Sequence, residues 1–413
     1  MRRFWSGGQY SLFRILFGCY LVIHFTYLLP WSAEIFSNHG ALQDAASSPF
    51  FGLIPNILSI NDSPEAVYRL LISAALASIL FSIGLQDKLM SIWILYVLIC
   101  IFARNPLIAN PAQPYIGWML LAHLFIPSGP CLSFSNHKEG TLGDNWHLPC
   151  WVYKAALVIL ALSYSYSGYT KLLSPSWISG DAISFVLHNP LARDYWLRDW
   201  MSLMPESIMQ FLTWFILYIE LLYAPLALIK KMRKWLWLSM LIVQFGFLVL
   251  LSFPDLTIPM ILFHMFTFDP RWVKFRRATT LEYVYFDGHC GFCHAFVKLI
   301  LAEDIGNKFR FSPLQGQHFT SMKNKFGQPS LTLDTMIVLT DKKEYLYKSD
   351  AAIHCLKRLG GLWSIIARMM ILIPKSVRDL GYSSIGKIRR KILRTPKSIC
   401  PVATTNQMNK FIP

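Results

Sequence analysis

Two cysteines separated by two residues, Cys290 and Cys293, are the pair in this 413-residue chain best suited to do chemistry. They belong to the segment Asp287-Gly288-His289-Cys290-Gly291-Phe292-Cys293, which lies where a predicted strand gives way to a predicted helix. The N-terminus of a helix offers free N–H groups and partial positive charge, which stabilise a thiolate at Cys290. Cys290 would attack a disulfide of the substrate, and Cys293, one helical turn later, would resolve the mixed disulfide. The spacing therefore predicts thiol-disulfide exchange.

A zinc site is the main alternative for this pair, because His289 and His294 flank it. Zinc needs about four ligands and usually a second close-spaced Cys or His pair. The remaining cysteines are scattered along the chain: Cys19, Cys100, Cys131, Cys150, Cys355 and Cys400. The strand-to-helix context favours redox chemistry, with no metal and no tightly bound cofactor expected.

A lysine near the end of a long apolar run, Lys171, is the second residue suited to chemistry. A lysine at such a place usually extends its ammonium group to the membrane interface. To act as a base it must be desolvated enough to lose its proton. Glu220, His264 and Trp177 also fall in or beside apolar runs, where polar groups normally face the interior of a helix bundle. Together with Lys171 they are candidates to line a polar cavity within the bundle.

The part of the chain before Pro270 has the composition of a membrane protein. Hydrophobic residues make up 54% of the whole sequence and charged residues 15%, against roughly 45–50% and 25% in soluble proteins. A full crossing needs about 20 apolar residues. The candidate spans are Ser11–Leu29, Val67–Gly84, Leu89–Phe102, Tyr115–Ile126, Trp151–Leu173, Ile208–Ile229, Trp235–Phe253 and Thr257–Phe268. We therefore expect a polytopic α-helical membrane domain of about eight helices.

Net charge is concentrated in the C-terminal part. From Pro270 on there are 24 Lys and Arg and 9 Asp and Glu, so +15 of the total +16 lies there. No stacking-aromatic or groove-reading motif accompanies this charge, which argues against nucleic acid as a partner. Basic clusters next to apolar runs mark the cytoplasmic side of a membrane protein. The clusters at Arg2-Arg3, Lys230–Lys234 and Arg271–Arg277 share that side if the chain crosses an even number of times, so both termini are expected in the cytoplasm.

Beyond Pro270 the pattern changes to short strands and helices. Strands are expected at Tyr283–Phe286, Phe309–Phe311, Thr335–Leu339 and Tyr345–Tyr347, and helices at Ala295–Glu303 and Ser349–Leu359. This β-α-β, β-β-α order is the succession of a thioredoxin-like fold. The apolar segment Leu362–Ile373 is too short to span a membrane and is expected to pack within the domain.

Residues from Leu281 to about Leu393 resemble the DCC family of thiol-disulfide oxidoreductases, named for an Asp-x-x-Cys-x-x-Cys signature. Further segments that match in family order are Phe309–Gln315, Thr335–Leu339, Ser349–Ala352, Leu359–Trp363 and Ile373-Pro374. The resemblance implies a C-terminal α/β thioredoxin-like domain with Asp287, Cys290 and Cys293 as functional positions. It also implies a disulfide- or dithiol-bearing protein or small molecule as substrate.

Residues from about Gln9 to Trp272 resemble the bacterial HTTM domain, the membrane-embedded relative of vitamin K-dependent gamma-carboxylases. The resemblance includes Gly168-Tyr169-Thr170-Lys171-Leu172, followed by Trp177 and Gly180. It implies that Lys171 is the base that deprotonates a reduced quinone. The chain lacks the large C-terminal lumenal part of the animal enzymes, and a shared fold does not supply a shared reaction.

We therefore predict an HTTM-like transmembrane domain over residues 1–272, a DCC-type thioredoxin-like domain over 280–395 and a tail over 396–413. The favoured function is a multi-pass thiol-disulfide oxidoreductase, a protein-disulfide reductase of the bacterial inner membrane, whose helical domain handles a quinone or a membrane lipid. One alternative is a gamma-carboxylase-like enzyme with Lys171 as base. The other is a non-catalytic membrane scaffold or lipid-binding protein. The sequence leaves the oligomeric state open.

Overall fold

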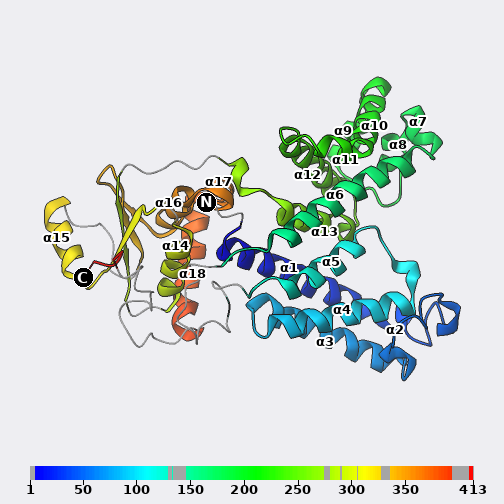
Figure 1. Cartoon of the computed structure of the whole chain (residues 1–413), viewed down its shortest axis with the longest axis horizontal. Coiled ribbons are helices and arrows are strands. Elements are labelled where there is room, and N and C mark those ends of the chain that lie inside the picture. Colours follow the sequence, from blue (N-terminus) through cyan, green and yellow to red (C-terminus); the bar gives the residue numbers. More distant parts are fainter. Residues whose placement is uncertain are drawn as a thin grey trace.

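The chain folds mostly into helices, with one small sheet in its C-terminal part (Figure 1). The computed structural model describes residues 5–128, 133, 146–273, 280–288, 291–304, 306–326, 335–392 and 409–412, with the backbone only at 291–292, 294–295 and 385–392. The expected succession of a helical part and a small α/β part is confirmed.

Helices lie over each of the predicted spans. They are α1 (Gly7–Leu28), α3 (Pro64–Ile83), α4 (Asp87–Arg104), α5 (Gln113–Phe125), α6 (Cys150–Lys171), α10 (Glu206–Leu221), α11 (Tyr223–Ala227), α12 (Arg233–Leu250) and α13 (Pro254–Thr267). The predicted span Ile208–Ile229 is divided between α10 and α11. Among the described residues, three helical stretches are long and apolar enough to cross a membrane: Gly7–Phe36, Pro64–Ile83 and Arg233–Leu250. That these three helices and the remaining ones cross a membrane stays a prediction.

The two ends of α3 illustrate how local sequence sets these helices. Ser63 Oγ accepts a hydrogen bond from the Ala66 N–H, and Pro64 takes the first helical position, where a missing N–H costs nothing. At the other end Gly84 adopts the left-handed conformation, with φ of 73°, and its N–H donates to the carbonyl oxygen of Phe81. These two caps confine α3 to the predicted span and one preceding turn.

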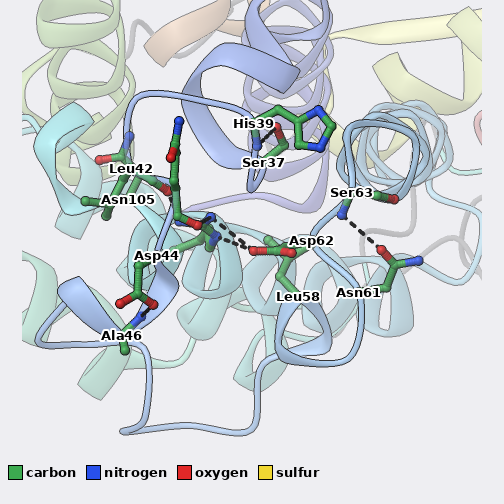
Figure 2. Close-up of polar contacts among 12 residues, drawn as sticks. Ser37, His39, Leu42, Asp44, Ala46, Leu58, Asn61, Asp62, Ser63 and Asn105 are labelled. Atoms are coloured by element: carbon green, nitrogen blue, oxygen red, sulfur yellow. Dashed lines mark hydrogen bonds and ion pairs between the residues drawn. The ribbon is translucent and has the colours of Figure 1, made fainter.

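The first long connection folds against the end of α4, and Figure 2 shows Leu42 and Asp62 of that connection together with Asn105, which directly follows α4. The guanidinium of Arg104 is buried at this contact. That guanidinium donates to the carbonyl oxygens of Leu42 at 2.7 Å and Gln43 at 3.3 Å, and it pairs with Asp62 at 3.1 Å. A buried charge needs such partners, so this contact is structural. The short helices of the connections are η1 (Leu29–Trp31), α2 (Ser32–Phe36), η2 (Ala45–Ser47), η3 (Ile57–Ser59), η4 (Pro106–Ile108), α7 (Pro175–Ser179), α8 (Ala182–Leu187), α9 (Trp196–Ser202) and η6 (Pro270–Trp272).

The sheet has four strands, β1 (Glu282–Phe286), β2 (Phe309–Pro313), β3 (Ile337–Leu339) and β4 (Tyr345–Tyr347), in the order β2-β1-β3-β4. β1 and β2 are parallel, whereas β3 is antiparallel to both β1 and β4. All four predicted strands are confirmed, and their order and directions fit a thioredoxin-like fold.

Helices cover both faces of this sheet (Figure 1). Four helices, α14 (Gly291–Glu303), α16 (Lys348–Leu359), α17 (Gly361–Ile371) and α18 (Lys375–Ile392), belong to one side, and α15 (Gln317–Phe326) packs on the other. The helix predicted from Ala295 begins earlier, at Gly291. The segment predicted to pack within the domain becomes α17, whose Trp363 and Ala367 are buried in the core.

The end of the segment predicted as a tail lies beside β2. The Phe311 N–H donates to the carbonyl oxygen of Lys410 at 2.9 Å, and the Ile412 N–H donates to that of Phe311 at 2.8 Å. The ring of Phe411 lies 5.7 Å from that of Phe311. Residues 409–412 therefore lie along the β2 edge of the sheet.

A buried carboxylate joins the start of the helical part to the α/β part. Glu303, at the end of α14, accepts hydrogen bonds from Ser6 Oγ at 2.5 Å and from the Gly8 N–H at 3.1 Å. It also accepts one from Trp363 Nε1 in α17 at 2.8 Å. The carboxylate lies at the N-terminus of α1, where a negative charge is favourable.

Candidate functional site

The predicted redox segment occupies the turn between β1 and α14. β1 ends at Phe286, Asp287 and Gly288 follow, and α14 begins at Gly291. His289 and Cys290 lie outside the described residues. Cys293 lies in the first turn of α14, 5% exposed, where it joins the core beneath the sheet. The predicted change from strand to helix at this segment is therefore confirmed.

A residue that sequence analysis had not assigned to the site, Gln315, holds the start of this turn. Its Nε2 donates to Asp287 Oδ1 at 3.2 Å, and its Oε1 accepts from the Gly288 N–H at 3.4 Å. Gln315 follows β2, the parallel neighbour of β1, and the carboxyl ends of parallel neighbours meet at one edge of a sheet. That placement was the available signal, because the two strands were already predicted.

The other described cysteine of this domain has a different environment. Cys355 is fully buried in α16, and burial raises the pKa of its thiol well above the ordinary value. A thiol of that kind is not a nucleophile at neutral pH. No group of three or more His, Cys, Asp or Glu side chains that could hold a metal occurs in the described part of the chain, which leaves out His289 and Cys290.

Lys171, Glu220 and Trp177, three of the residues predicted to line a membrane site, lie together. Lys171 ends α6, forms an ion pair with Glu220 of α10 and donates to Ser167 Oγ at 2.7 Å. Its ammonium nitrogen lies 5.0 Å from the centre of the Trp177 ring. The Lys171 side chain is 18% exposed and that of Glu220 only 5%. The arrangement is a charged pair at the edge of the helix bundle.

A close approach of two helices makes this pair possible. A Cβ atom at Gly168 would lie 2.2 Å from the Leu221 backbone nitrogen, so only glycine fits between α6 and α10. α10 ends at Leu221, directly after Glu220, and α11 begins at Tyr223. Ser165 Oγ accepts from the Ala224 N–H at 2.8 Å and so satisfies a backbone group at the break. Interrupted helices of this kind border ligand sites in membrane transporters.

His264, the remaining predicted member of the membrane site, lies deeper in the bundle and does not pair with Lys171. Its Nε2 lies 3.3 Å from the hydroxyl of Tyr164, and its Nδ1 lies 2.8 Å from the carbonyl oxygen of Met260. Gln244 Nε2 also donates to the Tyr164 hydroxyl, at 3.2 Å. His264 therefore belongs to a separate buried hydrogen-bond network.

Comparison with known proteins agrees with the geometry of the α/β part. Residues 284–395 match the model of the DCC1-like thiol-disulfide oxidoreductase family. The protein YuxK of Bacillus subtilis (strain 168), described as uncharacterized, is 32% identical over 128 residues, which cover 31% of this chain and 91% of YuxK. No solved structure matches the chain. The family match does not reach residues 1–272, and the resemblance of that part to the HTTM domain stays a prediction. Through its C-terminal α/β part, the chain belongs to the DCC1-like thiol-disulfide oxidoreductase family.

Proposed function

We propose that this chain is a membrane-bound thiol-disulfide oxidoreductase in which Cys290 is the nucleophile and Cys293 the resolving thiol. The observation that carries the proposal is the position of α14, which begins at Gly291, the residue after Cys290. The free N–H groups and partial positive charge of a helix start favour a thiolate there. Membership of the family supports the same assignment.

The reaction follows from this assignment. The thiolate of Cys290 attacks one sulfur of a substrate disulfide, the substrate S–S bond breaks, and the released thiolate takes up a proton. The Cys293 thiolate then attacks Cys290 Sγ and releases the second substrate thiol. The substrate, a protein or a small molecule, gains two electrons, and Cys290 and Cys293 are left as a disulfide. A dithiol donor restores the reduced pair by the reverse exchange.

The proposed topology places this domain on the same side of the membrane as the N-terminus. Ser6 and Gly8 at the start of α1 contact Glu303 at the end of α14, so the two regions cannot be separated by a bilayer. That contact supports an even number of crossings. The basic residues near both regions support a cytoplasmic location for them.

Insulin reduction by the purified full chain tests the proposal. Cys290→Ser should abolish turnover, and Cys293→Ser should trap a mixed disulfide, because the nucleophile remains but its resolving partner is gone. Cys355→Ser is the matched control and should retain activity, since that thiol is buried and unreactive. Turnover by Cys290→Ser, or a metal held by both sulfurs of the pair, would contradict the proposal.

The Lys171–Glu220 pair supports a second candidate function, binding of a quinone by the helical part. Residues of α10, α11 and α12 also line a groove of about 420 Å³ that could hold an isoprenoid chain, although neither Lys171 nor Glu220 lines it. The groove is lined almost entirely by apolar and aromatic side chains: Phe211, Trp214, Phe215, Tyr218, Ile219, Leu222, Leu226, Met232, Trp235, Leu236 and Ser239.

Binding of a short-chain ubiquinone analogue to the purified chain tests this candidate. Lys171→Ala should weaken binding about tenfold, the effect of losing about 1.4 kcal/mol. Lys154→Ala, an exposed lysine of the same helix, should leave the affinity unchanged. Equal affinity in both variants would reject quinone binding at Lys171. If cells contain carboxylated glutamate and lose it with Lys171→Ala, the gamma-carboxylase-like alternative is favoured instead. If the chain binds the quinone analogue but catalyses no reaction, the scaffold alternative is favoured.

A further inference from the structure

Aliphatic side chains are exposed together where α17 gives way to α18. They are Met369, Ile371, Leu372, Ile373, Val377 and Leu380, which we call the turn patch. Leu372 is 84% exposed and Leu380 is 69% exposed. Single exposed aliphatic residues are ordinary, but six of them within twelve consecutive residues form a patch that usually marks a binding surface.

The turn patch is not needed to build the domain. The inward face of α17 already contributes Trp363, Ser364 and Ala367 to the buried interior. The turn itself is held in shape from the polar side: Arg378 Nε donates to the carbonyl oxygen of Ile373 at 2.9 Å, and Asp350 pairs with Arg378 at 3.0 Å and with Lys375 at 2.7 Å. The aliphatic side chains are therefore presented on a turn whose conformation these polar contacts stabilise.

The turn patch lies close to the end of the helical bundle. α17 packs on η6, which follows α13, and Trp363 shares the carboxylate of Glu303 with Ser6 at the start of α1. An α-helix rises 1.5 Å per residue, so the end of α17 lies within roughly 16 Å of its start beside α1. Figure 1 shows α17 next to the end of the bundle where α1 begins.

Charge indicates what covers the turn patch. Three basic residues, Arg368, Lys375 and Arg378, accompany it. Two carboxylates lie beside them, Asp379 and the Asp350 that pairs with Lys375 and Arg378, so the local charge is +1. Aliphatic side chains flanked by basic ones suit the boundary between acyl chains and anionic headgroups. A surface that binds a second protein usually contains aromatic residues, and the turn patch has none.

We propose that the turn patch inserts into the surface of a bilayer that contains anionic phospholipid, so that the redox domain contacts the membrane independently of α1. The inference rests on the proposed membrane location of the chain. It adds a lipid-binding site to the domain that carries Cys290 and Cys293, and it fixes that domain at the membrane surface.

Photo-crosslinking of the full chain tests the inference. The chain is placed in nanodiscs of phosphatidylethanolamine and phosphatidylglycerol with a trace of diazirine-bearing phospholipid, and the labelled peptides are mapped by mass spectrometry. Label is expected on residues 369–380 as well as on α1, α3 and α12, and none on the exposed turn 341–344. Replacing phosphatidylglycerol by phosphatidylcholine should reduce the label on 369–380, because the basic residues lose their partner.

Charged substitutions provide the matched comparison. Leu372→Asp with Leu380→Asp should lower the label on 369–380 at least about tenfold and leave α12 unchanged, because carboxylates do not enter hydrocarbon. Thr320→Asp with Ser321→Asp adds the same charge at exposed positions of α15 and should change nothing. Insulin reduction in detergent checks that each variant is folded, and Leu372→Ser with Leu380→Ser replaces the aspartate pair if it is not.

The outcomes separate this inference from the proposed function. Label on α1, α3 and α12 but not on 369–380 overturns the inference alone. Absence of label throughout would overturn the proposed membrane location, and the insulin assay reports separately on Cys290 and Cys293.

Discussion

At the scale of single residues, the turn between β1 and α14, which we call the redox turn, depends on a side chain that reaches it from the end of the neighbouring strand β2. Gln315 bonds both to the carboxylate of Asp287 and to the N–H of Gly288. These two bonds set the direction in which the chain leaves β1 before it enters α14. The amide suits this position because it offers one donor and one acceptor at once.

Gln315→Ala should therefore lower the rate of insulin reduction, even though the nucleophile Cys290 is unchanged. Loss of a hydrogen bond of about 1 kcal/mol corresponds to roughly a fivefold effect. Gln315→Glu should be slower still, because its carboxylate repels that of Asp287. Gln317→Ala, a nearby glutamine on α15, is the control, and steady-state rates of the purified variants provide the measurement. Wild-type rates in Gln315→Ala would show that the turn does not need this support.

At the scale of elements, the contact between α6 and α10 brings Lys171 to Glu220. Gly168 lets the two helices approach until Lys171 reaches Glu220, and the break after Leu221 ends α10 at the same level. A larger residue at 168 would have to push the helices apart. The ion pair is therefore a consequence of helix packing.

Gly168→Ala should destabilise the chain by about 1–3 kcal/mol through overpacking. Gly246→Ala, in the middle of α12, meets no atom within 4 Å and should be neutral or stabilising by about 0.5–1 kcal/mol, because alanine favours helix. Denaturation of the purified variants in one detergent measures the difference. Equal stabilities would mean that α6 and α10 do not touch at Gly168.

A second element-scale contact predicts a pH dependence. Burial tends to raise the pKa of Asp350, but hydrogen bonds from Lys375 and Arg378 outweigh it and leave that pKa below its usual value. A carboxyl group with a lower pKa in the folded state stabilises the fold above its unfolded pKa of about 3.9, and the contribution is lost as pH falls through the folded pKa.

Asp350→Asn should therefore be less stable than wild type at pH 6, and the two curves should converge in strong acid. Stability of the α16–α18 region is measured by hydrogen exchange between pH 6 and pH 2.5. Glu344→Gln, at an exposed turn, should keep the wild-type profile. A constant difference between Asp350→Asn and wild type over the whole range would contradict the assignment.

At the scale of the whole molecule, Glu303 ties the redox helix to the first helix of the bundle. Three donors converge on its carboxylate, from Ser6, Gly8 and Trp363. Gly8 lies so close that a Cβ atom there would be 2.6 Å from Glu303 Oε1. This contact between the two parts therefore requires a carboxylate at position 303 and a glycine at position 8.

Once trypsin has cut the connection between the helical part and the α/β part, which contains Lys274, Arg276 and Arg277, the two fragments of Glu303→Ala should separate. Each donor left without an acceptor costs about 1–3 kcal/mol. Wild-type fragments should co-elute on size exclusion in detergent, and so should those of the control Glu344→Ala. Co-elution of the Glu303→Ala fragments would show that other contacts suffice to join the parts.

The sequence by itself determined the approximate positions of the elements and which cysteines form a close pair. Apolar periodicity placed helices over the candidate spans, and alternation placed β1 to β4, because both signals are local and repeat along the chain. It also assigned the dithiol to a strand-to-helix turn, which needs only the segment 283–303. Several boundaries differ by a few residues, as at Gly291, because helix ends depend on caps as well as periodicity.

Only the tertiary structure decided which distant residues meet. It paired Lys171 with Glu220, placed His264 elsewhere, and brought Gln315 to Asp287 and Glu303 to Ser6. It also divided the span Ile208–Ile229 into two helices and left the turn patch uncovered. Such contacts follow from how finished elements pack face to face, and a local pattern records which residues are apolar but not which neighbour they will face.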